Sequence, residues 1–564
     1  MPNVDYLNPL PVRRLIPILF CLMLTAAGSF AAPPQYAFRI TFKDKQGAPA
    51  LSATPAWLSA RAMARRNNFG IALDSTDRPV SPLYIDTVLQ LTGGVFHNTS
   101  RWLNHFVVLL EDSSQILQLI GKPYISSIEW VGYFSSGLHQ RVAGWENPKF
   151  ARERTGLPNA KVTGTSSYYG STWAQTTMVN GDYLHDRGFK GAGKLIVVMD
   201  EGFTGVDTHT GLDDMRNGGR LVETYNFKRN NSGVFTDGSH GTNCMSTMAG
   251  FNPGTYVGSA PEAQYALYAT EDGSVTDAIY ELDNLIAGIE RADSLGADVI
   301  SASVVYNIFF SPFSYSFTKA ELDGHTTNVA RVVNMAVAKG IFYTSSAGNE
   351  GGNFWNYLDS PGDADSALTV GSVNTGRNPS GFSSPGPSAS GRIKPDVCLL
   401  GEPVSIFGSG NLITNSSGTS FAAPQAAGYA ACLMQAYPRA TPYQIRQAII
   451  RSADSFLTPS AKRGYGVPDF SKVYNSLHVD TPTGEELLGV VPNPFRETVQ
   501  VSLRNAGTPA EVLLYDAVGR SIPFISERNG SIMEIRPASS LPSGMYILKA
   551  VIDGKLMIVK LIHY

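Results

Sequence analysis

Cysteine is scarce in this sequence: the 564 residues include only four, Cys21, Cys244, Cys398 and Cys432. They lack the close spacing that metal ligands require, and so small a number excludes a disulfide-rich scaffold or a structural zinc module. Beyond the N-terminal Cys21, the other three are an odd number. We expect them to be small buried residues, and the sequence neither requires nor excludes a disulfide among them.

An excess of charge of one sign is also lacking. Lys and Arg together number 44 and Asp and Glu 47, which gives a formal net charge of −3. Because the two signs of charge are nearly equal in number, the composition gives no basis for binding nucleic acid or an anionic membrane surface. The sequence has no internal repeat and no low-complexity tract, and 43% of its residues are hydrophobic, as in a globular protein. At this length we expect about two to four domains.

The N-terminus carries one hydrophobic run. Arg13 and Arg14 precede LIPILFCLMLTAAGSFA, an apolar stretch that ends in small residues. This order is typical of a secretory signal peptide, and the small residues place its cleavage after Ala31. A membrane anchor is the alternative, but the run is short and Pro17 interrupts it. We therefore predict a signal peptide over residues 1–31 and export of the remainder.

The middle of the chain alternates apolar strands with helices. Predicted strands lie at 194–200, 263–269, 297–303, 340–349 and 366–373, with helical periodicity at 277–295 and 326–339. This alternation predicts an α/β fold over residues 175–475, in which a parallel sheet carries helices on both faces. Because active sites of such sheets collect at the carboxyl ends of the strands, polar residues at those ends are the candidates for chemistry.

The two flanking regions have a different texture. Residues 36–150 precede the α/β region and contain apolar alternation at 106–110 and 126–134. After a polar linker at 476–488, short alternating strands separated by turns continue to the end of the chain. This pattern predicts a small β-sandwich over residues 489–564, which is near the size at which an independent core becomes possible.

Ser420 lies in NSSGTSFAAPQAAG, between a Gly-Thr pair and a run of small residues that predicts a helix. A serine hydroxyl is a weak nucleophile until a base removes its proton, so a catalytic role requires a histidine elsewhere. His240, in DGSHGTNCMSTMAG, stands at the start of a second predicted helix, and the following glycine permits a close backbone approach. Taken alone, this segment fits a catalytic base and a capping or surface histidine equally well.

Two further polar residues end predicted strands. Asp200 closes KLIVVMD, and an aspartate after such a strand is costly to bury unless it is paired, for which a histidine is the natural partner. Asn349, in SSAGNEGG, could donate its side-chain amide to a developing oxyanion together with the backbone N–H of Ser420. The simpler interpretations are a strand-end cap for Asp200 and a left-handed turn residue for Asn349.

The chain order of these residues, Asp, His, Asn, Ser, differs from that of the α/β-hydrolases and of the chymotrypsin-like enzymes. In the segments VVMD, HGTNC, SSAGNEG and GTSFAAP, the sequence resembles the subtilisin-like (subtilase) serine proteases. The resemblance implies that Ser420 is the nucleophile, His240 the general base and then acid, Asp200 its orienting carboxylate and Asn349 an oxyanion donor. A secreted endopeptidase acting on extracellular proteins or peptides is the predicted function.

The sequence departs from the family pattern at two positions. Glu201 follows Asp200 where a small residue is usual, and its charge either raises the basicity of the histidine or points to solvent. In SASVVYN, Ser303 matches the family serine but Val305 replaces a glycine at the edge of the substrate cleft. We take Ser303, Val305 and Gly348 as candidate substrate-binding residues. Val305 predicts a preference for small or slender side chains just before the scissile bond.

The flanks carry resemblances of their own. Residues 36–150, with LSARAMARRNN, SPLYIDTV and SRWLNHFVV, resemble the pro-regions of Bacteroidetes-type subtilases, which template folding and cover the active site until they are cleaved. A permanent accessory domain is the alternative. The exposed, basic KFARERTG at 149–156 is the candidate processing region. Residues 489–564, with VVPNPF, VLLYDAVGRSI and LPSGMYILKA, resemble the C-terminal sorting domain of type IX secretion cargo; a carbohydrate-binding β-sandwich is the alternative.

The partners implied are therefore protein or peptide substrates, the chain's own pro-region as inhibitor and the type IX secretion machinery, with no nucleic acid. The rival function is a catalytically silent surface protein that uses the same fold for binding, and Val305 is the feature that favours it. Subtilases often bind calcium, but no acidic run here defines a site, so no cofactor is assigned. The sequence does not determine the oligomeric state.

Overall fold

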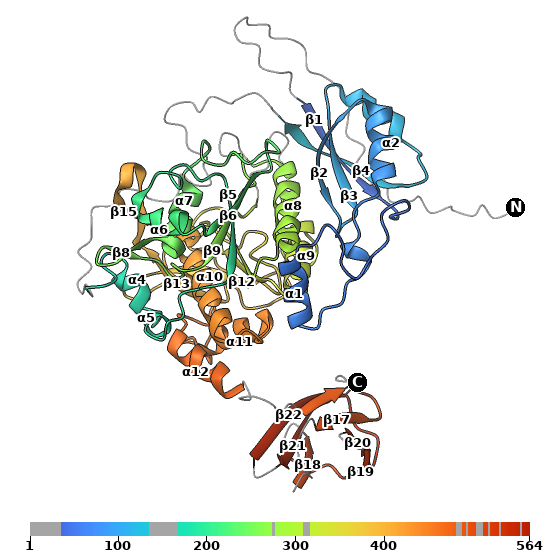
Figure 1. Ribbon diagram of the computed structural model, residues 1–564, viewed down its shortest axis with the longest axis vertical. Helices are drawn as coiled ribbons and strands as arrows, with labels where there is room; N and C mark the ends of the chain where they lie inside the picture. The colour runs from blue at the N-terminus through green and yellow to red at the C-terminus, as the bar shows by residue number, and fades with distance from the viewer. Residues whose placement is uncertain are drawn as a thin grey trace, which may run out of the picture.

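A computed structural model of the chain describes residues 35–134, 167–272, 277–307 and 316–480, and in the C-terminal part residues 488–491, 495–503, 511–516, 519–529, 532–552 and 555–563. The predicted signal peptide and the predicted processing region at 149–156 lie outside these ranges. Figure 1 shows the N-terminal region in blue, the large central region in green to orange and the C-terminal domain in red.

The central region is built on a parallel sheet, as the sequence predicts. Its seven strands pair side by side in the order β13 (Val397–Glu402), β12 (Leu368–Asn374), β11 (Phe342–Ser346), β10 (Val299–Ala302), β5 (Leu195–Asp200), β9 (Gln264–Ala269) and β6 (Leu221–Asn226). Every pairing within it is parallel. The strands β6 and β13 were not among those predicted, whereas the other five match the predicted segments, β12 ending one residue beyond its segment.

Helices cover both faces of this sheet (Figure 1). The side chains of β5 alternate between them: Leu195, Val197 and Met199 join a core with α8 (Ile279–Leu295) and α9 (Asn328–Ala338). Ile196 and Val198 join a core with α7 (His240–Ala249) and α10 (Thr419–Ala436). Because successive side chains of a strand point to opposite faces, Asp200 is expected on the face of α7 and α10. The fold thus directs the strand-end carboxylate toward the two helices that begin near His240 and Ser420.

Shorter elements complete the central region. They are α4 (Trp173–Thr177), α5 (Asp182–His185), α6 (Asp213–Asn217), β7 (Phe251–Asn252), β8 (Tyr256–Val257), β14 (Val404–Phe407), β15 (Ile413–Ser416), α11 (Pro442–Ser452) and α12 (Phe470–Asp480). Since α12 continues to Asp480, the first residues of the predicted linker at 476–488 are helical. The helix extends the hydrophobic periodicity of its first turns into this more polar stretch.

The N-terminal region is an antiparallel sheet with the strand order β2 (Val95–Ser100), β3 (His105–Leu110), β1 (Gln35–Phe42) and β4 (Ile125–Phe134). One face packs against its own helix α2 (Pro82–Thr92), with Phe38 and Val108 in that core. The opposite face, including Ala37 and Val107, packs against Ala278 and Tyr280 at the start of α8. The second face of this small α+β domain is therefore completed by the central region.

A buried ionic cluster joins the N-terminal region to the far end of α8. Asp293 on α8, with a fully buried side chain, contacts three arginines of the N-terminal region, Arg65, Arg66 and Arg101. Arg65 and Arg66 belong to α1 (Ala60–Asn68). Arg66 also pairs with Asp77 at 2.9 Å, and Asp77 in turn pairs with Lys339 of the central region at 3.0 Å. Burial acts to raise the pKa of Asp77, but the hydrogen bonds from Arg66 lower it to about 2.

The C-terminal domain has a core of its own. One sheet has the order β16 (Leu488–Val491), β17 (Val499–Leu503), β20 (Ile532–Pro537) and β19 (Phe524–Asn529), and the other has β18 (Glu511–Asp516), β21 (Gly544–Ile552) and β22 (Lys555–His563). Phe495, Val501, Leu514, Ile535 and Leu548 fill the space between them. The predicted β-rich C-terminal region is confirmed.

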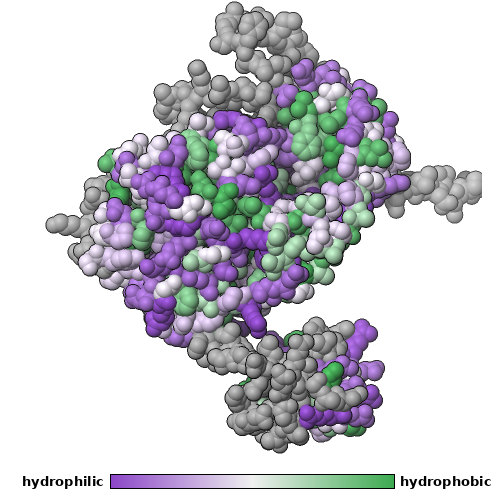
Figure 2. Space-filling model, viewed as in Figure 1, coloured by the Kyte–Doolittle hydropathy of each residue, from purple (hydrophilic) through white to green (hydrophobic). Residues whose placement is uncertain are grey.

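The surface carries both hydrophilic and hydrophobic residues. Figure 2 shows hydrophilic and hydrophobic residues intermixed over the visible face of the central region. In the described part of the chain, no helix combines the length and the apolar character needed to cross a membrane.

Candidate active site

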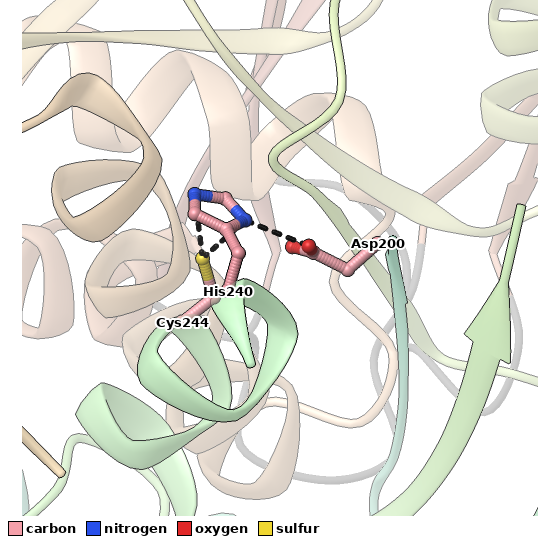
Figure 3. Close-up of side chains that lie close together, drawn as sticks. All are labelled: Asp200, His240 and Cys244. Carbon is pink, nitrogen blue, oxygen red and sulfur yellow. Dashed lines mark hydrogen bonds and ion pairs between the residues drawn. The ribbon is translucent and has the colours of Figure 1, made fainter. Parts of the chain in front are cut away.

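Asp200 and His240 meet at the carboxyl edge of the sheet. Asp200 is the last residue of β5, and its Oδ1 lies 2.7 Å from Nδ1 of His240, the first residue of α7 (Figure 3). Both side chains are buried. The same Oδ1 accepts the backbone N–H of Glu201 at 2.8 Å. The contact fixes the imidazole with its Nδ1–H toward the carboxylate, which leaves Nε2 as the basic nitrogen.

Gly241 explains how the helix comes so close to the strand. A side chain on Gly241 would place its Cβ 2.5 Å from the carbonyl oxygen of Gly202 and 2.8 Å from Cβ of Asp200. Any larger residue would therefore push the start of α7 away from β5. The close approach that the sequence predicts for the glycine after His240 is thus present.

Ser420 is the second residue of α10, and its backbone is held in place by two side chains. Its carbonyl oxygen accepts a hydrogen bond from Oγ of Ser303 at 2.9 Å and from Sγ of Cys244 at 3.3 Å. The ring of Phe421, the next residue, lies 5.7 Å from the imidazole of His240 between centroids. The start of α10 is therefore adjacent to His240. The backbone N–H of Ser420 is also one of those that a helix leaves without an intrahelical partner.

Asn349 follows the end of β11 and is joined to the same helix start. Its Oδ1 accepts hydrogen bonds from the backbone N–H of Thr419 at 3.0 Å and from Oγ1 of Thr419 at 2.9 Å. These bonds fix the carboxamide plane and turn its N–H₂ group away from Thr419. The positive φ of this turn belongs to Gly348, at +99°, and not to Asn349. The simpler interpretation of Asn349 as a left-handed turn residue is therefore wrong.

Cys244 is a member of the site that the sequence reasoning missed. It stands one helical turn after His240, and its Sγ lies 3.8 Å from both ring nitrogens (Figure 3). Cys244, Cys398 and Cys432 are all buried, as expected, and each is a free thiol. The signal that could have identified Cys244 is its spacing, because residues four apart on a helix share one face.

Glu201 does not point to solvent, so one of its two predicted interpretations is excluded. The residue is only 5% exposed, and its Oε1 accepts the backbone N–H of His240 at 3.3 Å. A side chain on Gly238 would collide with this carboxylate. Glu201 therefore packs beneath the loop that leads into α7.

The three candidate substrate-binding residues follow the ends of β10 and β11, and Ser303 contacts Ser420. Ser303 and Val305 follow β10 directly, and Ser303 contacts the Ser420 carbonyl as described above. Gly348 immediately precedes Asn349. Val305 is buried, with 8% of its surface exposed. The structure thus brings the ends of β10 and β11 to the start of α10.

Two groups of side chains have the ligand types and proximity for a metal ion. One is Asp200, His240 and Cys244; the other is Glu271, Asp277 and Glu281, all buried, with ligand atoms within 4.8 Å of one another. In the second group, Glu271 accepts from the hydroxyl of Tyr306, and Glu281 accepts backbone N–H groups of Asp272 and Ala278. These hydrogen bonds give carboxylate oxygens of Glu271 and Glu281 donor partners within the protein. No sequence run marks this group because its members come from a strand end and a helix start.

Comparison with known proteins agrees with this arrangement. Residues 191–468 match the subtilase family. Subtilisin DY of Bacillus licheniformis is 30% identical over 296 residues, which cover 50% of this chain and 92% of that protein. A subtilisin of Bacillus pumilus is 30% identical over 289 residues, with 50% and 92% covered. The crystal structure of fervidolysin from Fervidobacterium pennivorans, a keratinolytic enzyme related to subtilisin, aligns with a TM-score of 0.52 at 16% identity, over 95% of this chain and 78% of that one.

The chain therefore belongs to the subtilase family and is a serine endopeptidase of the subtilisin type. Its flanks match as well: residues 37–143 match the peptidase S8 propeptide domain of Bacteroidota, and residues 489–563 match a secretion system C-terminal sorting domain. The sorting domain marks the protein for export across the outer membrane, to the cell surface or the medium.

Proposed function

We propose that the mature protein hydrolyses peptide bonds of extracellular proteins or peptides through Ser420, His240 and Asp200 and a covalent acyl-enzyme. The observation that carries this proposal is the buried 2.7 Å contact between Asp200 and His240 beside the start of α10. A buried carboxylate at that position stabilises the imidazolium that forms when the histidine takes a proton.

The proposed steps follow from these positions. His240 Nε2 takes the proton of the Ser420 hydroxyl as Oγ bonds to the substrate carbonyl carbon, whose π electrons move to oxygen. The backbone N–H of Ser420 and the side-chain N–H₂ of Asn349 then stabilise the oxyanion. His240 returns the proton to the leaving amine, and the acyl-enzyme forms. Water, activated by the same histidine, releases the second product.

We propose the following organisation of the chain: a signal peptide at 1–31, a pro-region at 36–150, a catalytic domain at 175–475, a linker at 476–488 and a sorting domain at 489–564. The contacts of the N-terminal region along α8 support its role as a folding template and inhibitor, since its sheet buries one face only when docked. Export then proceeds through the signal peptide and the type IX machinery, with the pro-region and the sorting domain removed.

The test uses the full chain, expressed with its own processing allowed to occur, beside Ser420→Ala. Casein hydrolysis and covalent labelling by a fluorophosphonate probe are measured on both. Activity and labelling in the wild type, with loss of both in the variant, support the proposal. A folded, processed wild type that shows neither signal would contradict it and favour a binding protein on the same fold.

A further inference from the structure

Asp359 is a buried carboxylate beside the candidate substrate-binding residues, and no motif in the sequence marks it. The residue is 2% exposed. Its Oδ1 accepts a hydrogen bond from Nδ2 of Asn307 at 2.9 Å. Its Oδ2 lies against Gly348: a Cβ built on that glycine would stand 2.0 Å from this oxygen. The carboxylate therefore lies between the segment that follows β10 and the segment that follows β11.

These contacts form part of a ring that returns to the nucleophile. On one side, Ser303 binds the Ser420 carbonyl, and the chain continues to Asn307, which binds Asp359. Tyr306 holds this segment against the Asp359 loop, because its N–H donates to the carbonyl of Ser360 at 2.8 Å and its carbonyl accepts from Ser360 at 2.9 Å.

The other side of the ring runs through the oxyanion residue. The backbone N–H of Asp359 donates to the carbonyl of Ala347 at 3.3 Å. Ala347 leads through Gly348 to Asn349, which binds Thr419 beside Ser420. Asp359 is the one charged residue among those that form this ring: Ser303, Val305, Tyr306, Asn307, Asp359, Ser360, Ala347, Gly348, Asn349, Thr419 and Ser420.

We propose that Asp359 makes this enzyme selective for lysine or arginine on the amino side of the scissile bond. The inference rests on the proposed function, since it takes Ser420 as the nucleophile and Ser303, Val305 and Gly348 as the residues that receive that side chain. The electrostatic attraction between a cation and a carboxylate contributes far more to the binding free energy in such a water-poor position than at the surface. A substrate with an uncharged side chain binds without this contribution.

Val305 also favours lysine or arginine before the scissile bond. A β-branched residue at this edge narrows the space for an aromatic ring, whereas the unbranched methylene chain of lysine or arginine remains slender up to its charged end. The slender preference predicted from the sequence and the charge of Asp359 thus select the same substrates.

The sequence that joins the pro-region to the catalytic domain agrees with this specificity. Between residues 135 and 167 it contains Arg141, Lys149, Arg152, Arg154 and Lys161. An enzyme that removes its own pro-region would find its preferred residues there.

The test compares peptides that differ only at the residue before the scissile bond: lysine, arginine, the uncharged lysine analogue norleucine, and phenylalanine. The full chain, allowed to process itself, is assayed beside Asp359→Asn and a matched control, Asp365→Asn. Asp365 lies in the same loop but pairs with Arg392 at 2.7 Å. Fluorophosphonate labelling of each sample reports on Ser420 independently of the peptide.

The expected result is a kcat/KM for lysine or arginine about tenfold or more above that for norleucine, lost in Asp359→Asn and kept in Asp365→Asn. Norleucine cleaved as well as lysine by a labelled wild type overturns this inference alone, whether or not the variant folds. A charge preference that persists in labelled Asp359→Asn overturns it as well. No labelling of the processed wild type overturns the proposed function, and this inference with it.

Discussion

Arg66 and Asp293 form an ion pair of 2.8 Å across the boundary between pro-region and catalytic domain, and neither side chain has any exposed surface. Removing charges from water is expensive, so a buried pair is stable only while both partners are present. Each part of the protein thus carries charges that the other neutralises. Separation of the two returns Asp293 and its arginine partners to water.

Asp293→Asn should destabilise the docked pro-region strongly, because three arginines then lose their shared carboxylate. The expected loss is about 3–5 kcal/mol, as when one partner of a buried ion pair is removed. Urea unfolding of the full chain, followed through the first transition, measures it. Asp213→Asn is the matched control: its pair with Arg216 is at the surface, and its loss should cost less than about 0.5 kcal/mol. Equal effects of the two substitutions would disprove the role of the buried cluster.

Docking of the pro-region should weaken as the pH falls from about 6.5 to about 4. Burial lowers the pKa of His97 to about 4, although its hydrogen bond to Asn284 of α8 opposes the shift. An undocked His97 takes up a proton near its ordinary pKa, whereas the docked one stays neutral. The docked state is therefore fully favoured above about pH 7 and loses up to roughly 3 kcal/mol by pH 4.

Hydrogen exchange of β1 to β4 in the full chain, at several values of pH, measures this dependence. His97→Asn should make the dependence less steep, with the remainder supplied by His105, whose pKa burial also lowers beside Asp283 of α8. Substitution of the exposed His325 by asparagine should leave it unchanged. A profile for His97→Asn as steep as that of the wild type would show that other groups govern the pH response.

Asp200→Asn should reduce kcat by about 10³–10⁴ while the protein stays folded, because an amide no longer holds the imidazole in the tautomer that accepts the Ser420 proton. Steady-state kinetics on a peptide substrate, with near-ultraviolet circular dichroism as the folding control, measures it. A loss smaller than about tenfold would be incompatible with the role proposed for the carboxylate.

Mercuric ion should inactivate the enzyme through Cys244, because an ion bound to Sγ would lie against His240 and the Ser420 carbonyl. Cys244→Ser should retain measurable activity and become resistant. Burial raises the pKa of Cys398 to about 12 and also raises that of Cys432, so neither thiol is expected to react comparably. Cys398→Ser and Cys432→Ser should stay as sensitive to mercuric ion as the wild type. Resistance in either variant would show that mercury acts at that thiol and not at Cys244.

The sequence was sufficient for the parts of the fold that have a local signal. The strands that end at Asp200 and Ala269 are largely apolar runs, and the helices that begin at His240 and Thr419 follow turns that contain a glycine. Their order along the chain then determined which residues meet at one edge of the sheet. The proximity of Asp200, His240 and the start of α10 follows from that order.

Residues that act only through distant contacts were not predictable in this way. Asp359 stands in a loop without a distinctive sequence pattern. Only its contacts with Gly348 and Asn307 in the folded protein place its carboxylate beside the candidate substrate-binding residues. Arg66 and Asp293 are 227 positions apart, and neither segment indicates its partner. The strand β6 was missed because LVETYN carries Glu, Thr and Asn among its six residues and lacks a continuous apolar run, as suits a strand at the edge of the sheet.

If the pro-region is removed as proposed, we expect its shared face with α8 to make activation irreversible. Once cut free and released, the pro-region exposes Ala37, Val107, Leu109 and Val131 to water while its basic cluster loses Asp293. We expect such a fragment to unfold readily and to become a substrate of the protease that it has left. On the proposed function, the pro-region would then be digested by the enzyme that it covered, and each molecule could be activated only once.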